Sequence, residues 1–261
     1  YNHLFQVEEA IDVSETPSSS YWSQFRRYEY RKHNFTMAIF WSPYLVRTTQ
    51  LQEPPFNLFL DEPDPNWTQQ ISGFDYVIIS AGHWFSRPSI FYIQNQLAGC
   101  LYCPQSNITH HTTSFSYRHA FRTAFRAIVQ QTNFTGITFL RSFAPSHFEN
   151  GYWDQGGDCV RQRPYRPQET QSDDYTMELY QIQLEQLKIA QREGRGRALK
   201  FRMMDVTRAM LMRPDGHPSK YGHLPNANVV LYNDCVHWCL PGPVDSWNDF
   251  LIQLLRREKA S

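Results

Sequence analysis

The sequence predicts an α/β fold, because short apolar runs typical of strands alternate along the chain with longer amphipathic segments typical of helices. The strand-like runs are nearly continuous in apolar residues, which favours a parallel sheet covered on both faces. They lie at residues 35–41, 74–80, 137–140 and 199–204. These observations indicate a mostly parallel sheet with helices packed against it.

Each expected strand has its own local signal. The run FTMAIFW at 35–41 is interpreted as a buried strand, and FDYVIIS at 74–80 as a second one that ends in a turn at Ala81 and Gly82. The third run, 137–140, directly follows Gly136. The fourth, 199–204, has alternating apolar and basic residues.

Three segments have the apolar spacing of helices. In residues 116–131 the apolar side chains share one face and three arginines take the other. Residues 173–193 begin with two aspartates, which suit the positive end of the helix dipole, and stop before Gly194. Residues 245–257 form the last predicted helix.

Long segments rich in Pro, Gly and Asn separate these elements at residues 50–71, 143–170 and 213–233, and are expected to be loops. Loops at the edge of such a sheet often carry function. No clear domain boundary appears within residues 1–261, which are therefore expected to belong to one domain.

The composition narrows the function. Lys and Arg together number 25, as do Asp and Glu, so the formal net charge is zero and nothing favours nucleic acid as a partner. No run approaches the roughly 20 apolar residues of a membrane-spanning helix. Aromatic residues make up 15% of the chain. Most of these rings are expected in the core, and some could stack on sugars.

Glycosylation sequons and cysteines favour a secretory lumen, where disulfides persist. Sequons begin at Asn34, Asn66, Asn107 and Asn133, and the five cysteines are Cys100, Cys103, Cys159, Cys235 and Cys239. Cys100 and Cys103, followed by His110 and His111, have the spacing of a metal site. A disulfide is the preferred interpretation in this compartment, so no metal is expected.

The segment from Asp234 to His237 carries the strongest chemical signal. An Asp three residues before a His in a turn can hold the imidazole in one tautomer and stabilise its protonated form. The imidazole can then take a proton from a serine hydroxyl and later return it. The alternative is an ordinary surface ion pair, since Asp-x-x-His is a common spacing.

Other candidates follow the expected strands. Gly82 and His83 come after one strand, where the Gly82 backbone could approach an acyl group, or where the segment could simply form a strand-ending turn with a packed Trp84. Arg141 and His147 follow the next and could contact substrate, or form a structural hydrogen bond under a loop. The Asp215-Gly216-His217-Pro218 segment is interpreted as a rigid structural turn.

The segment DCVHWCLPGPVDSWND, residues 234–249, resembles the signature of the plant trichome birefringence-like family. Four further blocks are similar to the same family, and the order of all five is that of its C-terminal part. They are FDYVIISAGHWFSRP (74–88), GITFLRSFAPSHFENG (136–151), GGDCVR (156–161) and RPDGHPSKYGH (213–223). The resemblance implies an SGNH-hydrolase-like three-layer sandwich with a mostly parallel central sheet, whose N-terminal part is missing.

The resemblance also implies roles. His237 matches the family's catalytic base and Asp234 its triad acid, while the family's nucleophile is the serine of a Gly-Asp-Ser motif. Here Gly157-Asp158 is followed by Cys159, so the nucleophile is expected upstream and the chain is expected to be inactive alone. Cys159 with Cys235, and Cys239 with an upstream cysteine, are the pairings considered, although the sequence alone does not fix them.

The implied activity is acetyl transfer by double displacement to a hemicellulose, with xyloglucan first. It needs an acetyl donor, acetyl-CoA or another carrier, and no bound cofactor. The expected location is the Golgi lumen, in a type II protein held by an anchor upstream of this chain. Two alternatives remain at this point, a carbohydrate acetylesterase and a non-catalytic binding protein for wall polysaccharides.

Overall fold

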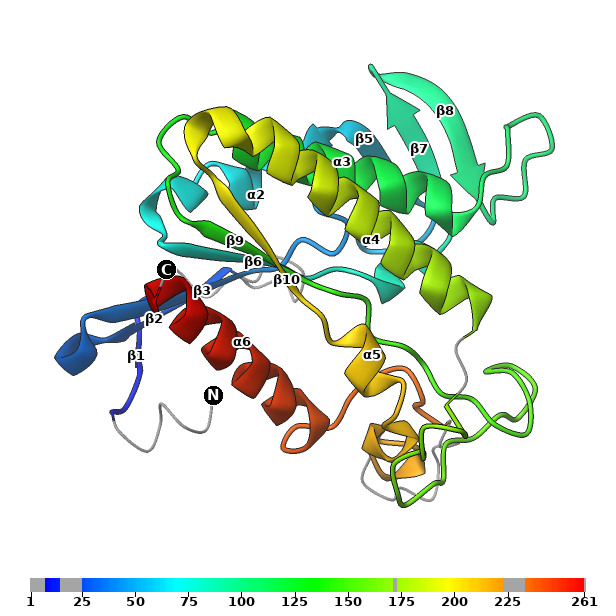
Figure 1. Cartoon of the computed structure of the whole chain (residues 1–261). Coiled ribbons are helices and arrows are strands. Elements are labelled where there is room, and N and C mark those ends of the chain that lie inside the picture. The colour runs from blue at the N-terminus through cyan, green and yellow to red at the C-terminus, as the bar shows by residue number, and fades with distance from the viewer. Residues whose placement is uncertain (1–7, 15–24, 171–172, 223–232, 261) are drawn as a thin grey trace. The chain divides into compact units, whose positions relative to one another are not determined.

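A computed structural model describes residues 8–14, 25–170, 173–222 and 233–260 of the chain (Figure 1). They divide into two compact units. The first unit comprises Tyr1–Gly73 and Ser86–Gln131, and the second comprises Phe74–Phe85 and Thr132–Ser261. Part of the predicted loop 213–233, including His223, lies outside the described residues.

The first unit contains a small antiparallel sheet of β1 (Ile11–Asp12), β2 (Phe25–Tyr30) and β3 (Phe35–Phe40). The predicted strand at 35–41 is therefore confirmed as a strand, but its predicted burial is wrong. Phe35 and Ile39 are exposed, because β3 is the outer strand of this hairpin sheet and pairs only with β2 in it.

A second, mixed sheet of the first unit joins β4 (Val46–Thr49), β5 (Phe56–Pro63), β7 (Ser89–Ile93) and β8 (Gln96–Leu101) in that order. Helix α3 (Thr113–Gln130) packs on β5, where Thr123 Oγ1 donates to the Leu60 carbonyl at 2.6 Å.

The prediction of a loop across residues 50–71 is wrong, because β5 and the short helix α2 (Pro65–Thr68) lie in that segment. Phe56, Leu58 and Leu60 alternate inward and are buried. This period of two identifies a half-buried strand despite the surrounding prolines.

The second unit is built on a parallel sheet of β6 (Tyr76–Ile79), β9 (Ile137–Arg141) and β10 (Lys200–Met204), in the order β10-β9-β6. Three predicted strands are thus confirmed. The middle strand β9 buries Phe139 and Leu140 fully, whereas Tyr76 and Ile78 of the edge strand β6 are exposed, so the buried character inferred for residues 74–80 is wrong.

The α/β class is confirmed, but the described strands form three sheets of which only this one is parallel throughout. A single, mostly parallel central sheet in a three-layer sandwich therefore remains a prediction.

Three helices accompany the parallel sheet: α4 (Asp174–Glu193), α5 (Thr207–Met210) and α6 (Pro243–Ala260). Asp173 caps α4 by accepting a hydrogen bond from the Thr176 N–H at 2.6 Å. Helices α4 and α6 both contact β10, and Figure 1 shows them on opposite sides of that strand. Single 3-10 turns lie at Arg31–His33, Ile71–Gly73, His83–Ser86, Gly194–Arg197, Pro214–Gly216 and Lys220–Gly222.

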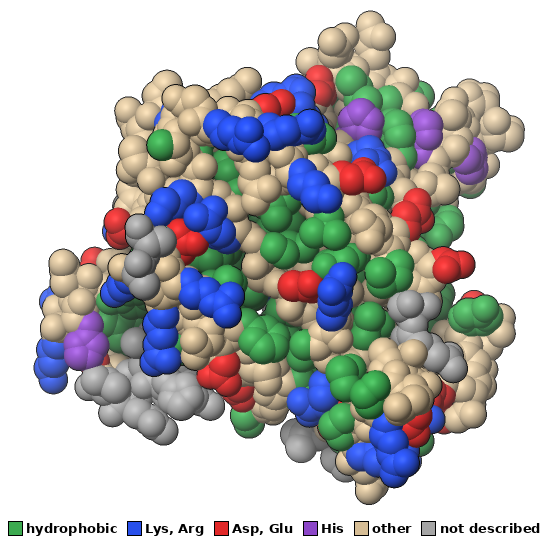
Figure 2. All heavy atoms as spheres, in the orientation of Figure 1, with side chains coloured by type: hydrophobic (Ala, Val, Ile, Leu, Met, Phe, Trp, Pro, Cys, Tyr) green, Lys and Arg blue, Asp and Glu red, His purple; other side chains and the backbone are tan. Residues whose placement is uncertain are grey.

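The described helices include none with the length and apolar character needed to cross a bilayer. On the face shown in Figure 2, basic side chains are scattered among acidic ones, in keeping with the zero net charge.

Candidate active site

The loop that carries Asp234 and His237 is fixed at both ends by backbone hydrogen bonds. Ser219 and Asp234 exchange two, at 2.9 and 3.0 Å, and the Cys239 N–H donates to the Gly216 carbonyl at 2.9 Å. Residues 234–239 are therefore paired with residues 216–219 through backbone hydrogen bonds. This backbone pairing holds the loop, and with it the side chains of Asp234 and His237, in one orientation.

The carboxylate of Asp234 holds His237 in two ways. Its Oδ2 lies 2.9 Å from the imidazole Nδ1, and its Oδ1 accepts the His237 backbone N–H at 2.9 Å. Burial raises the pKa of Asp234, but hydrogen bonds from the backbone and ring of His237 outweigh it, so the pKa lies below its usual range. The group is an ionised carboxylate that orients the imidazole.

The imidazole of His237 is open to solvent, with 78% of its side chain exposed. Since Asp234 occupies Nδ1, Nε2 is the nitrogen left to exchange a proton with a reacting group. This is the arrangement of the acid and base members of a Ser-His-Asp triad. The described pair has the geometry for general base chemistry toward a hydroxyl brought to that nitrogen.

A disulfide also anchors the loop that carries Asp234 and His237. Cys235, directly after Asp234, is bonded to Cys159, one of the pairings considered from the sequence. The Cys235 carbonyl also accepts the His147 N–H at 3.0 Å. Cys239 is a free thiol whose pKa is raised by burial and then by Asp234, and its pairing with an upstream cysteine stays a prediction.

The predicted disulfide between Cys100 and Cys103 also forms, in the first unit. Together with His110 these cysteines are the one group of three or more His, Cys, Asp or Glu side chains, among the described residues, whose potential ligand atoms all lie within 4.8 Å of one another. Metal binding requires free thiolates. The disulfide leaves none at this cluster.

His83 sits in the 3-10 turn after β6, with its ring 4.7 Å from that of Phe143. Burial, followed by the charges of Arg141 and His237, lowers its pKa to about 4, so the ring is neutral at neutral pH. Gly82 makes room for the same phenyl ring, since a Cβ there would lie 2.9 Å from a Phe143 side-chain atom.

Arg141 ends β9 and its guanidinium is firmly held. Its Nε donates to Ser80 Oγ at 2.6 Å, its Nη1 donates to the Ser142 carbonyl at 3.1 Å, and the group lies over the Trp247 ring. The sequence left two roles open for Arg141, contact with substrate and a structural hydrogen bond under a loop. The structural hydrogen bonds are present, and the electrostatic effects of Arg141 and His237 on His83 show that these three groups share one neighbourhood.

His147 is buried rather than presented to a substrate. Its Nδ1 lies 2.8 Å from Nε2 of His217, and its Nε2 lies 3.3 Å from the Leu211 carbonyl. His217 in turn approaches the backbone of the candidate base, with Nδ1 2.7 Å from the His237 carbonyl oxygen. Sequence reasoning missed this pair of histidines because 70 positions separate them.

The Asp215-Gly216-His217-Pro218 segment is a tightly packed turn around its glycine. A Cβ on Gly216 would lie 2.4 Å from Pro243 and 2.9 Å from the Trp238 ring, so no side chain fits there. Trp238 covers His217, with ring centroids 4.2 Å apart. The buried histidines are thus enclosed by the loop that they support.

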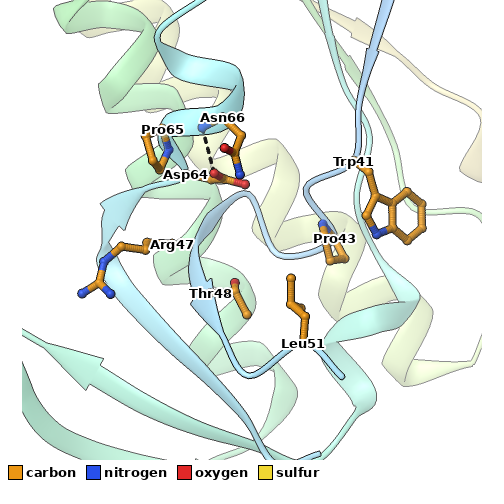
Figure 3. A pocket seen from close by; sticks show the side chains of 8 residues that line it. All are labelled: Trp41, Pro43, Arg47, Thr48, Leu51, Asp64, Pro65 and Asn66. Atoms are coloured by element: carbon orange, nitrogen blue, oxygen red, sulfur yellow. Dashed lines mark hydrogen bonds between the residues drawn. The ribbon is translucent and has the colours of Figure 1, made fainter. Parts of the chain in front are cut away.

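A small hollow lies in the first unit and is lined by none of the residues described above (Figure 3). It is lined by Trp41, Pro43, Arg47, Thr48, Leu51, Asp64, Pro65 and Asn66. Its charged side chains already have partners: Asp64 accepts from Ser42 and Asn66, and Arg47 pairs with Glu62. Nothing in this lining resembles the paired acid and base of the second unit.

Comparison with known families decides the relationship. The model of the PC-esterase family, described as a GDSL/SGNH-like acyl-esterase family found in Pmr5 and Cas1p, matches residues 6–254. The chain belongs to this family. Asp234, His237 and the other residues of the candidate site all lie inside the part that matches as a PC-esterase.

Curated relatives of this PC-esterase chain confirm the resemblance to trichome birefringence-like proteins. Protein trichome birefringence-like 19 of Arabidopsis thaliana is 51% identical over 98% of the chain and 60% of its own length. Xyloglucan O-acetyltransferase 4 of Populus trichocarpa is 39% identical over 98% of the chain and 62% of its own length. Xyloglucan O-acetyltransferase 2 of Arabidopsis thaliana is 35% identical over 98% of the chain and 64% of its own length. The chain thus spans less than two thirds of these relatives.

Proposed function

We propose that this chain supplies the acid and base of a Ser-His-Asp triad in a plant polysaccharide O-acetyltransferase, with xyloglucan as the first expected acceptor. The observation that carries the proposal is the 2.9 Å contact between Asp234 Oδ2 and Nδ1 of an exposed His237. The names of two relatives supply the substrate. The nucleophilic serine comes from a segment outside this chain, so the chain alone is inactive.

The first half of the reaction forms an acetyl-enzyme. Nε2 of His237 takes the serine proton, and the serine oxygen bonds to the carbonyl carbon of the acetyl donor. The donor's own bond to that carbon breaks, and the leaving group departs with the proton from His237. Asp234 stabilises the imidazolium that exists between these two events.

The second half transfers the acetyl group. His237 takes the proton of a sugar hydroxyl, whose oxygen attacks the acetyl carbon, and the serine oxygen leaves with that proton. The donor is acetyl-CoA or another acetyl carrier, and the reaction consumes no other cofactor. Backbone N–H groups stabilise the oxyanion of each tetrahedral intermediate.

The acceptor surface that we assign within this proposal is the loop around Tyr152 and Trp153, whose side chains are 72% and 75% exposed. The loop is held at its base, because Asn233 Nδ2 donates to the Gly157 carbonyl at 3.2 Å and Cys159 is bonded to Cys235. Exposed aromatic rings on a loop whose base is held are suited to stacking on pyranose faces.

The proposal includes a Golgi-lumen location, in a protein whose membrane anchor lies outside this chain. Two disulfides and four sequons support a secretory compartment. All four sequon asparagines, Asn34, Asn66, Asn107 and Asn133, are exposed, so each is accessible to a glycosylating enzyme.

A carbohydrate acetylesterase is the second candidate, because the family description names acyl-esterases and water can replace the sugar in the second half-reaction. The test uses the natural-length protein with an acetyl donor and xyloglucan oligosaccharides, followed by mass spectrometry. Gain of acetyl groups by the oligosaccharide supports the transferase. Acetate release from acetylated oligosaccharide alone supports the esterase, and binding without either change supports a non-catalytic protein.

A further inference from the structure

The buried histidines pose a question of proton count. Three short contacts run in a row: Leu211 O to His147 Nε2, His147 Nδ1 to His217 Nε2, and His217 Nδ1 to His237 O. Each contact needs one N–H to be a hydrogen bond, because carbonyls only accept. Three protons are therefore required, and two neutral imidazoles carry only two. One contact must go without a proton while both rings are neutral.

The distances decide which contact goes without. Leaving the 2.7 Å contact between His217 Nδ1 and the His237 carbonyl without a proton would bring two lone pairs together at close range, and so would the 2.8 Å contact between the rings. The contact of His147 Nε2 with the Leu211 carbonyl is the longest, at 3.3 Å. The proton is least needed there, which leaves both histidines protonated at Nδ1.

We propose that His217 is a positioning residue for the base, locked by His147 into the Nδ1–H tautomer so that it always donates to the carbonyl of His237. The donation fixes the peptide that carries the exposed imidazole, while Asp234 fixes the ring itself. His147 thereby acts two contacts away from the reacting nitrogen. This inference rests on the proposed function for the role of His237, whereas the tautomers follow from the contacts between two neutral, buried rings.

The surroundings keep the pair neutral. Burial lowers the pKa of His147 and lowers that of His217 to about 4, although carboxylates lie within electrostatic range. Those facing His217 are Asp234 and Asp215, and those facing His147 are Asp173, Glu149 and Asp215. A third proton would complete the Leu211 contact only by placing a cation in a buried site.

The direct test is the protonation state of the ring nitrogens. Long-range proton–nitrogen NMR spectra of the natural-length protein, labelled with nitrogen-15 histidine, distinguish the two tautomers at neutral pH. We expect Nδ1–H for both His147 and His217, assigned with single variants of each. The Nε2–H tautomer at His217 would overturn the proposal, whatever the enzyme's activity.

Two substitutions test the consequence for catalysis. His217→Asn places an amide N–H near the Nδ1 position, whereas His217→Phe removes the donor and keeps the ring. We expect His217→Phe to lower kcat by on the order of 10- to 100-fold with KM unchanged, and His217→Asn to retain most of kcat. Equal losses of kcat in two folded variants would contradict the positioning role. If either variant fails to fold, the tautomer measurement decides.

Discussion

The exposed pair Asp234–His237 and the buried pair His147–His217 show how surroundings set the use of one side chain. His237 faces solvent with the Asp234 carboxylate 2.9 Å from its Nδ1, whereas His217 is enclosed and its partner is another imidazole. The first environment suits a ring that gains and loses a proton in each cycle. The second suits a ring that stays neutral and gives one constant hydrogen bond. The two pairs meet at the carbonyl of His237.

Removing the exposed imidazole of His237 should have the largest effect on activity. In the natural-length protein, His237→Ala should lower kcat for acetyl transfer by about 10⁴-fold or more, because no base remains for the hydroxyl. The free energy of unfolding should change by no more than about 1 kcal/mol, since an exposed ion pair contributes little. His33→Ala, at an exposed histidine of the first unit, is the matched control and should leave the rate intact. A normal rate for His237→Ala would remove the imidazole from the mechanism.

The disulfide next to Asp234 should contribute more to the free energy of unfolding than the disulfide in the first unit. Cys159 and Cys235 close a separation of 76 residues, against 3 for Cys100 and Cys103. The chain-entropy relation gives about 4.5 kcal/mol for the longer loop and about 1.6 kcal/mol for the shorter. Urea unfolding of the two Cys→Ala double variants measures both. A larger loss from the shorter loop would show that loop closure does not govern these bonds.

The two pairs should affect the free energy of unfolding in different pH ranges. His217 is neutral when folded, with its pKa lowered to about 4 from 6.5, so the unfolded chain binds more protons between those values. The free energy of unfolding should therefore fall as the pH drops from about 6.5 to 4, by about 3 kcal/mol from this ring. The stability contributed by Asp234 is present above its unfolded pKa of 3.8 and is lost only below that pH.

Urea midpoints measured across this pH range, on the wild type and on His217→Phe, test the assignment. The variant should lose part of the pH dependence between 4 and 6.5. The same slope in both proteins would place the titration elsewhere. His237→Ala serves as the control, because its exposed ring lies outside this enclosure.

The smallest expected effect concerns the acceptor. Trp153→Ala should raise KM for a xyloglucan oligosaccharide several-fold, up to about tenfold, because one stacked ring contributes roughly 0.5–1.5 kcal/mol. Stability should not change, since the side chain is exposed. Tyr221→Ala removes another exposed ring outside this loop and is the matched control. Equal changes in KM for the two variants would remove the loop from the acceptor surface.

Local patterns in the sequence predicted the features that depend on few positions. The helix now seen at Asp174–Glu193 was predicted within one residue, because its aspartate cap and Gly194 mark both ends. Asp234 and His237 were predicted together because three residues of one turn set their contact. The strands of the parallel sheet were predicted from apolar runs, which β9 satisfies by burial on both faces.

Features that depend on distant neighbours could not be predicted in this way. The run at 35–41 has the composition of a buried strand, and only its place at the edge of a hairpin sheet exposes it. Nothing near His147 in the sequence points to His217, since the chain passes through β10 before the two rings meet. The same holds for Gly82, whose neighbour Phe143 comes from the segment after β9.

The most direct test of the account is acetyl transfer by Asp234→Asn in the natural-length protein, measured with a xyloglucan oligosaccharide. Asparagine keeps the shape of the side chain but removes the charge that stabilises the imidazolium and selects the tautomer of His237. We predict a fall in kcat of about 10⁴-fold with unchanged folding. Turnover at the wild-type rate by the folded variant would contradict the claim that this carboxylate orients the base.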